Sequence, residues 1–331
     1  MSASRLSVVM PMYNAARFVE AAIDSILAQT MGDFIFYIVD DGSTDASGDI
    51  AARKAATDRR IRLIRQSNQG IVASMNRMLG LVETPFVARM DADDISLPDR
   101  FALQLAHFDR TPTLGALGGQ YVEIDNGGRR RSGHFRQPVG CDDVRAELEL
   151  RPAVANPTVM FRTDALRKAG LYRPAFGYCE DYDLFLRLSE IADIDNLPDT
   201  LLLYRRSPEQ MSVANNAQQT EQAAYARLAH LVRKTGAPDP FRDMARLPAL
   251  VDLDALLKKP GIGRMVETDI IAARRYAVAS MADSEFVDYC KRLASGVRLE
   301  AATRTVVRCL VNRRVDRAFR LASSLVAGVF V

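Results

Sequence analysis

The stretch YIVDDGSTDAS at residues 37–47 runs an apolar, strand-like segment directly into two aspartates, a glycine and a serine-threonine pair. Moving even one carboxylate out of water costs several kcal/mol unless it gains a hydrogen-bond or ionic partner. The sequence therefore predicts a buried strand that ends where Asp40 and Asp41 meet either a ligand or a structured loop. A helix is expected to follow over residues 45–56.

The same pattern recurs through the first half of the chain, where short apolar runs alternate with helical stripes. Such alternation is typical of βαβ units and a mainly parallel sheet. Strands are expected at LSVVMP, FIFYIVD, IRLIRQ and FVARM, and later at LGALGGQYVEID, PTVMFR and TLLLYRR. Polar clusters follow the first four strands, at the edge where open α/β sheets bind ligands. The predicted fold is α/β, a mixed, mainly parallel sheet flanked by helices, with a helical region beyond about Ser207.

Composition limits the class of protein. The chain has 331 residues, of which 48% are hydrophobic and 26% charged, and this suits a globular protein with a sizeable core. No run approaches the ~18 apolar residues that span a bilayer, and a strand begins at Leu6 without a signal sequence ahead of it, so a cytoplasmic location is expected. The four scattered cysteines are expected to be free thiols. A net charge of +3 gives no support for a nucleic-acid partner.

A second acidic stretch, RMDADDISLPDRF at residues 89–101, follows the fourth strand. Asp91 and Asp93 are two residues apart, so their side chains point the same way at a strand end. Paired carboxylates repel unless a cation lies between them, and oxygen ligands select a hard ion such as Mg²⁺ or Mn²⁺. Too few protein ligands are evident for a closed cage, so water and a bound diphosphate would complete the shell. Alternatively, these acids cap the helix that follows Pro98.

Three more loops at the same edge are candidates for nucleotide binding. In MPMYNAARF, Pro11 stiffens the chain and Tyr13 offers a flat face to a base, unless this tyrosine belongs to the core. Asp41 can accept the imide hydrogen of a uracil or a ribose hydroxyl while Asp40 holds the loop; an Asx turn without a ligand is the alternative. In RQSNQG, Asn68 precedes a helix start, which suits either a phosphate or an ordinary cap.

The last piece is GYCEDYDLF at residues 177–185. Glu180 and Asp181 stand at the start of a predicted helix, whose dipole favours the anionic form of a carboxylate at neutral pH. Such a group can take a proton from an acceptor hydroxyl as that oxygen attacks. Acids in a first helical turn also complement the dipole without any catalytic role. The helix is expected to bury one face, made of Leu184, Phe185, Leu188 and Ile191.

Together these stretches resemble the inverting family 2 glycosyltransferases, which have the Rossmann-like GT-A fold. The resemblance covers residues 5–212 and rests on the order and spacing of SVVMPMYNAARF, IVDDGSTD, NQGIVASMN, ARMDADDISLPDR, NPTVMFR, EDYDLFLRL and LYRRSPEQMS. It divides the chain into a nucleotide-sugar-binding half at 1–115, an acceptor-binding half at 116–212 and a helical C-terminal region at 213–331.

The resemblance implies roles at matching positions. Asp181 would be the catalytic base, and Asp91 and Asp93 would hold Mn²⁺ or Mg²⁺, Asp93 directly and Asp91 leaning towards ribose or a metal-bound water. Donor binding would involve Pro11, Tyr13, Asp41, Asn68, Asp91 and Arg206. The donor would be a nucleotide-diphospho-sugar, with UDP suggested by Asp41, and the acceptor a glycan or lipid-linked glycan. One sugar would be transferred with inversion, in the assembly of a cell-surface polysaccharide or lipopolysaccharide.

The chain also departs from the family pattern. Ser207 stands where relatives often have His after YR-x, so Arg205 or Arg206 would have to contact the diphosphate instead. The chain has no tryptophan, which excludes the Q-x-x-R-W motif of processive synthases. A catalytically inactive nucleotide-sugar-binding module is the main alternative function, disfavoured by the retention of the pair Asp91 and Asp93 and of Asp181. A sugar nucleotidyltransferase would need a GxGTR-like loop after the first strand, where this chain has MPMYNAA.

The C-terminal segment is basic. Residues 298–320 contain seven arginines against Glu300 and Asp316, and the apolar stretch LASSLVAGVFV follows them at residues 321–331. A helix of this kind can lie on the anionic inner face of the plasma membrane as a peripheral contact. The alternatives are that its apolar side packs on the body of the protein, or on a second subunit in a homodimer.

Overall fold

A computed structural model of the chain describes residues 4–131, 136–207 and 216–275 and, further on, residues 281, 283, 285–287, 289, 290, 299–312, 314, 316–319 and 321. The chain forms two compact units, Met1–Gln210 and Met211–Val331. The halves expected at 1–115 and 116–212 fall within the first unit except for residues 211 and 212, and the boundary between the halves remains a prediction.

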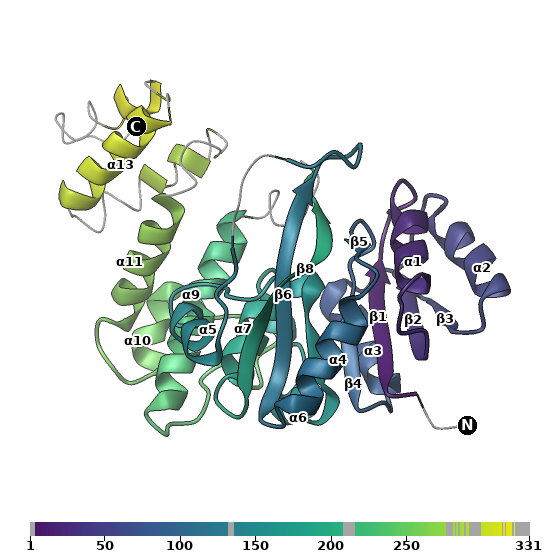
Figure 1. The fold of residues 1–331 in the computed structure, drawn as a ribbon. Helices are drawn as coiled ribbons and strands as arrows, with labels where there is room; N and C mark the ends of the chain where they lie inside the picture. Colours follow the sequence, from purple (N-terminus) through teal and green to yellow (C-terminus); the bar gives the residue numbers. More distant parts are fainter. Residues whose placement is uncertain are drawn as a thin grey trace. The chain divides into compact units, whose positions relative to one another are not determined.

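The first unit is built on one eight-stranded sheet with the order β3-β2-β1-β4-β7-β6-β8-β5 (Figure 1). Its strands are β1 (Leu6–Met12), β2 (Phe34–Asp40), β3 (Ile61–Arg65), β4 (Phe86–Arg89), β5 (Ile95–Ser96), β6 (Leu114–Ile124), β7 (Met160–Arg162) and β8 (Asp193–Arg205). The pairs β1–β2, β2–β3, β1–β4 and β6–β8 are parallel, whereas β7 is antiparallel to β4 and β6, and β5 is antiparallel to β8. The mixed, mainly parallel sheet predicted from the sequence is confirmed.

Helices cover the sheet as the alternating pattern predicts. They are α1 (Val19–Leu27), α2 (Ser47–Thr57), α3 (Ile71–Leu81), α4 (Arg100–Arg110), α5 (Cys141–Leu148), α6 (Thr163–Ala169) and α7 (Glu180–Leu188), with short 3-10 turns at Asn156–Thr158 and Pro174–Phe176. Because α7 ends at Leu188, Ile191 does not lie on its buried face as expected from the sequence and is more than half exposed.

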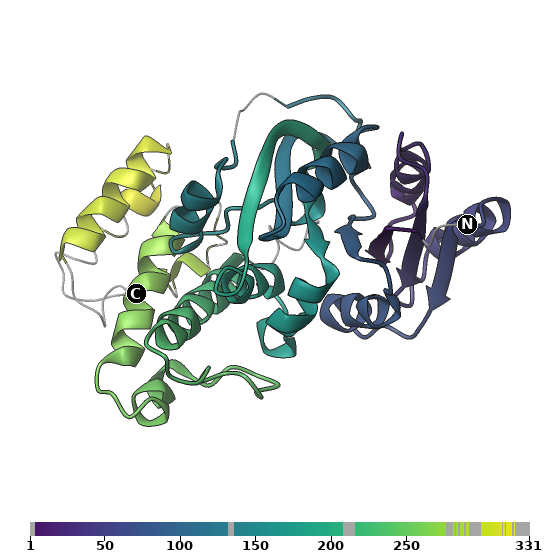
Figure 2. The same cartoon turned by 60° about the horizontal axis from the view of Figure 1, so that its bottom comes forward.

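The strand expected at TLLLYRR is longer than its apolar part, because β8 begins at Asp193. Figure 1 and Figure 2 both show β6 and β8 running side by side along their length. Pro198 lies inside β8 although it has no N–H to donate. The register with β6 steps from Leu197 directly to Thr200, so Pro198 sits in a bulge where no ladder hydrogen bond is required of it.

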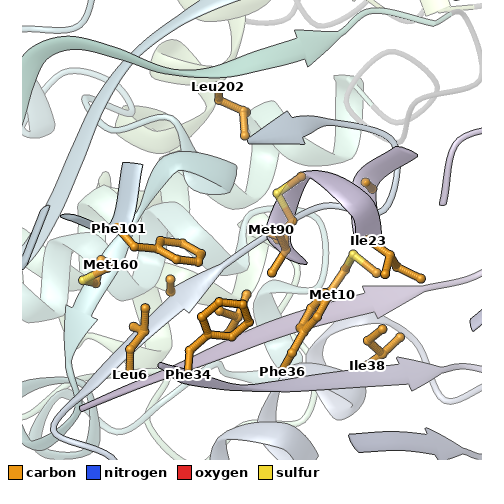
Figure 3. Packing of buried hydrophobic residues seen from close by; sticks show 14 of the residues in the cluster. Leu6, Met10, Ile23, Phe34, Phe36, Ile38, Met90, Phe101, Met160 and Leu202 are labelled. Atoms are coloured by element: carbon orange, nitrogen blue, oxygen red, sulfur yellow. The ribbon is translucent and has the colours of Figure 1, made fainter. Parts of the chain in front are cut away.

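The main core of this unit lies on one side of the sheet. Its side chains come from alternate positions of β1, β2 and β4 and from α1, α2 and α4. Figure 3 shows Met10, Phe34, Phe36 and Ile38 beside Met90 and Phe101, all of them buried. The central strand β1 is buried at every position, as expected for a parallel strand covered on both faces.

Gly42 allows two loops at the carboxyl edge of the sheet to touch. Its φ is +77°, and a Cβ built on it would lie 2.7 Å from the backbone N of Asn68 and 3.2 Å from the carbonyl O of Gln66. Only glycine avoids both the strained backbone and the clash. The loop after β2 is therefore packed directly against the loop after β3.

The second unit is helical as predicted. Its described helices are α9 (Asn216–Lys234), α10 (Leu253–Leu256), α11 (Ile262–Arg274) and α13 (Leu299–Val311), with a 3-10 turn at Leu250–Asp252. A small core near the end of the described chain includes Phe286, Tyr289, Cys309 and Leu321. None of the helices that the structure describes is long and apolar enough to cross a membrane.

Replacing Gly42 with alanine is expected to lower the free energy of unfolding by about 1–3 kcal/mol, because the added methyl group meets fixed backbone and φ stays positive. Gly80 is the matched control. It lies inside α3 with no atom within 4 Å of an added Cβ, so Gly80→Ala should leave stability unchanged or raise it by about 0.5–1 kcal/mol. Urea denaturation of both variants measures the difference, and equal stabilities would contradict the loop contact.

Candidate active site

The loops after β1 and β2 are joined by side-chain hydrogen bonds. Asn14 has a left-handed backbone with φ of 47°, and its Oδ1 accepts from the backbone N of Thr44 at 2.8 Å. The backbone N of Ala16 donates to Oδ2 of Asp45 at 3.0 Å. Tyr13 projects beside this junction and is 51% exposed, so it does not belong to the core and its ring is accessible to a ligand.

The two aspartates that end β2 are both buried and both hydrogen-bonded. Oδ1 of Asp40 accepts from the backbone N of Ser43 at 3.0 Å, as expected for the residue that holds its own loop. Asp41 holds the neighbouring loop as well. Its Oδ1 accepts from Nε2 of Gln66 at 2.7 Å and from the backbone N of Gln69 at 2.9 Å, and its Oδ2 accepts from the backbone N of Gly70 at 2.8 Å.

These contacts place Asn68 in a loop whose end is fixed by Asp41, at the start of α3, and Asn68 itself is exposed. Pro11 lies within β1 and is buried, one residue before Met12, whose carbonyl accepts from the backbone N of Asp41 at 2.9 Å. The carboxyl ends of β1 and β2 therefore meet, as the sequence predicts, while base recognition by Asp41 stays a prediction.

The three acids after β4 have different environments. Asp91 and Asp93 are partly exposed, whereas Asp94 is buried and its Oδ1 accepts from the backbone N of Arg205 at 2.7 Å. Burial raises the pKa of Asp94 well above its usual range, and the charges of Asp93 and Asp91 add to this shift. Asp94 is thus a structural group, and the D-x-D pair retains the two more accessible carboxylates.

Two buried arginines hold the backbone of this loop. The guanidinium of Arg205 donates through Nε to the carbonyl of Asp93 at 2.7 Å. Arg100, at the start of α4, donates through Nη2 to the carbonyl of Arg89 at 2.7 Å and to that of Val159 at 3.3 Å. Neither residue was given this role from the sequence; the only signal is their position, one near the end of a strand and one opening a helix.

Arg206 does not share the buried position of Arg205. Its Nε donates to Oε1 of Glu123 at 2.7 Å, and its guanidinium carbon lies 4.8 Å from the centre of the Tyr204 ring. Arg205 is occupied by the D-x-D loop, which leaves Arg206 as the more exposed of the two arginines next to Ser207. Its contact with a diphosphate remains a prediction.

The start of α7 is anchored from behind. Asp183 is buried between Arg173 and Arg187, which donate to its Oδ2 through Nε at 2.9 Å and through Nη2 at 2.8 Å respectively. This fixes the first turn of the helix, where Glu180 is buried and Asp181 is half-buried. Oδ1 of Asp181 accepts from the backbone N of Tyr182 at 2.7 Å.

The acids at the start of α7 titrate in the direction opposite to the helix-dipole effect. Burial, together with the charge of Asp181, raises the pKa of Glu180 to about 8, and the charge of Arg89 opposes the shift. Burial also raises the pKa of Asp181, and again Arg89 opposes it. Desolvation therefore outweighs the dipole that the sequence suggested, because Glu180 is buried and Asp181 is half-buried, so both carboxylates have lost water.

Asp91 interacts electrostatically with both of these acids and forms an ion pair with Arg89, whose Nη2 lies 3.0 Å from its Oδ1. The structure thus brings Asp91 and Asp181 into one cluster, while Asp41 lies at the same sheet edge, on the far side of β1. No group of three or more His, Cys, Asp or Glu side chains within the described part of the chain is arranged to hold a metal alone. Two oxygen-donating carboxylates suit a hard cation whose other ligands come from a diphosphate and water.

The sheet order, with ligand-facing loops at the ends of β1, β2 and β4 and an acid-bearing helix beside them, defines a GT-A nucleotide-sugar transferase fold. Solved structures share it. The chain aligns with S. aureus TarS in complex with UDP-GlcNAc with a TM-score of 0.59 and 17% identity, covering 98% of this chain and 92% of that one. It aligns with the mannosyltransferase PcManGT of Pyrobaculum calidifontis, in complex with GDP-Man and Mn²⁺, with a TM-score of 0.55 and 18% identity over 97% and 86%.

Residues 7–170 match the sequence model of glycosyl transferase family 2, and the chain belongs to this family of glycosyltransferases. It is 28% identical to an uncharacterized glycosyltransferase of Haemophilus influenzae over 66% of this chain and 70% of that protein. It is 29% identical to the amylovoran biosynthesis glycosyltransferase AmsE of Erwinia amylovora over 62% of this chain and 78% of that protein. The family expected from the motifs is confirmed.

Glu180→Gln should stabilise the protein in a pH-dependent way. A folded-state pKa of about 8 lies above the unfolded value, so the parent loses stability as the pH rises from about 4.3 to 8, while glutamine carries no charge to bury. The variant should unfold like the parent near pH 4 and be more stable by roughly 1–3 kcal/mol at pH 8. Denaturation curves at several pH values test this, with the exposed Glu83→Gln as control; a difference that does not change with pH would contradict it.

Proposed function

We propose that this glycosyltransferase moves one sugar from a nucleotide-diphospho-sugar, with UDP the expected nucleotide, to an acceptor hydroxyl with inversion and with the help of a divalent metal ion. The observation that carries the proposal is the single cluster formed by Asp91 of the D-x-D pair, Asp181 at the start of α7, and Arg89. In an inverting displacement the diphosphate leaves from one side of the sugar while the hydroxyl attacks from the other. Asp91 is proposed to act near the diphosphate and Asp181 at the hydroxyl, so a cluster that contains both residues suits this reaction.

The relatives support a nucleotide-sugar donor. TarS has been solved with UDP and with UDP-GlcNAc, and PcManGT with GDP-Man and Mn²⁺. The proposed donor contacts are Pro11, Tyr13, Asp41, Asn68, Asp91 and Arg206. Since AmsE acts in amylovoran biosynthesis, we place the transfer in the assembly of a cell-surface polysaccharide or lipopolysaccharide, with a glycan or lipid-linked glycan as acceptor.

Asp91 and Asp93 are the residues that would hold Mn²⁺ or Mg²⁺. Both are partly exposed, and Asp94 is withdrawn because it is buried against the backbone of Arg205. A bound metal would supply positive charge to the departing diphosphate. The chain's own part is to keep these two carboxylates on a loop whose backbone is held by Arg100 and Arg205.

Asp181 would take the proton of the acceptor hydroxyl as its oxygen attacks the anomeric carbon. Because burial raises the pKa of Asp181, the residue is charged only above the range of an ordinary aspartate. Transfer should therefore fall off on acidification at a higher pH than the ~3.9 of an exposed aspartate would give.

Asp181→Asn is expected to lower kcat by about 10²–10⁴, since the amide cannot accept the proton. Binding of Mn²⁺ and nucleotide should be unchanged by isothermal titration calorimetry, because the D-x-D loop is untouched. The donor is first identified by thermal shift with a panel of nucleotide sugars with and without Mn²⁺, where a tight ligand raises the unfolding midpoint.

Asp164→Asn is the matched control, since Asp164 is an exposed acid in the first turn of another helix, α6, and should leave kcat unchanged. Full transfer by the D181N variant would remove Asp181 as the base. A parent protein that binds a nucleotide sugar without hydrolysing or transferring it would favour the inactive binding module.

We also propose that the C-terminal region contacts an anionic membrane surface. On α13, Val307, Leu310 and Val311 are about half exposed or more, whereas Thr305 and Cys309 on the other side are buried. Arg304 is exposed on the same helix. Of the seven arginines, Arg298, Arg313 and Arg320 lie outside the described residues, as does 322–331. Arg317 does not face outward as a surface helix would require, because it is buried and paired with Asp283 at 2.9 Å.

A basic surface with exposed apolar side chains suits acidic lipid headgroups and their acyl boundary, whereas a second copy would bring like charges together. Full-length protein should therefore float with vesicles containing phosphatidylglycerol and not with pure phosphatidylcholine. A double variant, Val307→Ser with Val311→Ser, should lose most of this binding. Leu231→Ser, which removes an equally exposed side chain from α9, is the control. Equal flotation of both variants, or dimerisation lost with the double variant, would contradict membrane contact through α13.

A further inference from the structure

Arg89 is the last residue of β4 and precedes the D-x-D loop. Its side chain is 6% exposed, and Nη2 lies 3.0 Å from Oδ1 of Asp91. The atoms Nε and Nη1 are also buried and have no hydrogen-bond partner among the described residues. Because an unsatisfied buried guanidinium is costly, its presence at this position is explained by charge rather than by packing.

The direction of the Arg89 side chain follows from the strand period. Ala88 and Met90 belong to the main core, whose described members include residues of α1, α2 and α4 and none of α3 or α7. Side chains alternate along a strand, so Arg89 points to the opposite face of the sheet. The guanidinium therefore lies on the α3 and α7 side.

Tyr172 helps to close this side of the site. Its backbone is held by Asn76 of α3, whose Nδ2 donates to the Tyr172 carbonyl at 2.8 Å and whose Oδ1 accepts from the Tyr172 backbone N at 3.1 Å. The hydroxyl of Tyr172 is buried without a described partner, like the two nitrogen atoms of Arg89. The segment that carries Tyr172 is thus fixed to α3, and the buried guanidinium of Arg89 interacts with its neighbours with less screening than it would in water.

The positive charge of the Arg89 guanidinium acts on three carboxylates. Arg89 is paired with Asp91, and its charge also acts on Glu180 and Asp181, where it opposes the effect of burial. Without the guanidinium, Asp91 would lose its described ionic partner. The positive charge that opposes the pKa shifts of Glu180 and Asp181 would also be lost.

We propose that Arg89 is a positioning residue that fixes the side chain of Asp91, the first carboxylate of the D-x-D loop, for binding of the metal ion and the diphosphate. This inference rests on the proposed function. It means that the first carboxylate of the proposed metal-binding loop is held by a buried side chain of the strand that precedes the loop.

The test measures how Arg89→Met and Arg89→Lys bind Mn²⁺ with UDP, or with GDP if that nucleotide gives the larger thermal shift in the parent. Arg89→Met should weaken binding about tenfold or more, as expected for the loss of a hydrogen bond between charged groups. Arg89→Lys, which keeps the charge, should recover most of the affinity. In a D91N background, Arg89→Met should change affinity less than about twofold, because the interaction it removes is already absent.

Kinetics with the donor found by the panel complete the test. Arg89→Met should lower kcat as well as affinity, and Arg89→Lys should restore part of both. Arg162→Met removes an arginine from the neighbouring strand β7, where it lies opposite Phe86, and should leave binding and kcat at parent values.

An Arg89→Met variant that binds and turns over like the parent would overturn the inference. So would an equal loss of affinity with and without D91N, since Arg89 would then act through general stability, which unfolding midpoints measured in parallel would reveal. If the parent itself binds neither nucleotide with Mn²⁺, the proposed function fails and this inference fails with it; if the parent binds and only the coupling is missing, the proposed function stands alone.

Discussion

The constraint on which the rest of this structure depends is the cost of burying carboxylates where strands end. Asp40, Asp41 and Asp94 are all withdrawn from water, and each is stabilised by hydrogen bonds from backbone N–H groups. These bonds give the loops their shape. The ligand-facing edge of the sheet is consequently a set of loops tied to one another by acids, rather than a set of separate flexible connections.

Arginines perform the complementary task around the D-x-D loop. Arg100 and Arg205 donate to its backbone and to that of its neighbours, and Arg89 is paired with its first carboxylate. The loop has three carboxyl groups within four residues, so buried positive charge nearby helps to keep it folded before any metal binds. Charged pairs also hold the start of α7. There, Arg173 and Arg187 donate to Asp183 and so fix the helix that carries Asp181.

Periodicity in the sequence was sufficient to predict the parallel half of the sheet, because strands covered on both faces have continuous apolar runs and each is followed by an amphipathic helix. It could not predict the start of β8, where Asp193–Leu197 pair with β6 ahead of a bulge and little in the local pattern indicates a strand. The candidate residues were located through motifs at strand ends. Their partners were not, since the roles of Arg100 and Tyr172 depend on contacts with residues 11 and 96 positions away, and no local rule predicts that Arg89 is buried beside Asp91.

The assignment of roles within the acidic pairs also needed three dimensions. From the sequence, Asp40 was expected to hold structure and Asp41 to face the nucleotide, but Asp41 accepts three hydrogen bonds from the loop after β3. Likewise, a helix dipole was expected to keep Asp181 ionised, and burial acts against it. A rule based on the local sequence predicts the direction in which one effect shifts a pKa. The net shift depends on how deeply the group is buried in the fold.

The hydrogen bonds that Asp41 accepts from residues 66–70 limit which substitutions could change the preference for a nucleotide donor. Substitution of Asp41 would remove the hydrogen bonds that support the adjacent loop, along with any contact to a base. A change of selectivity at this position would therefore also destabilise the loop. Tyr13 and Asn68 lie near Asp41 and are exposed, and substitution of their side chains would not remove the support of this loop. If Tyr13 and Asn68 contact the donor as proposed, relatives that accept other nucleotides should diverge at those two positions first, and attempts to change the donor are best begun there.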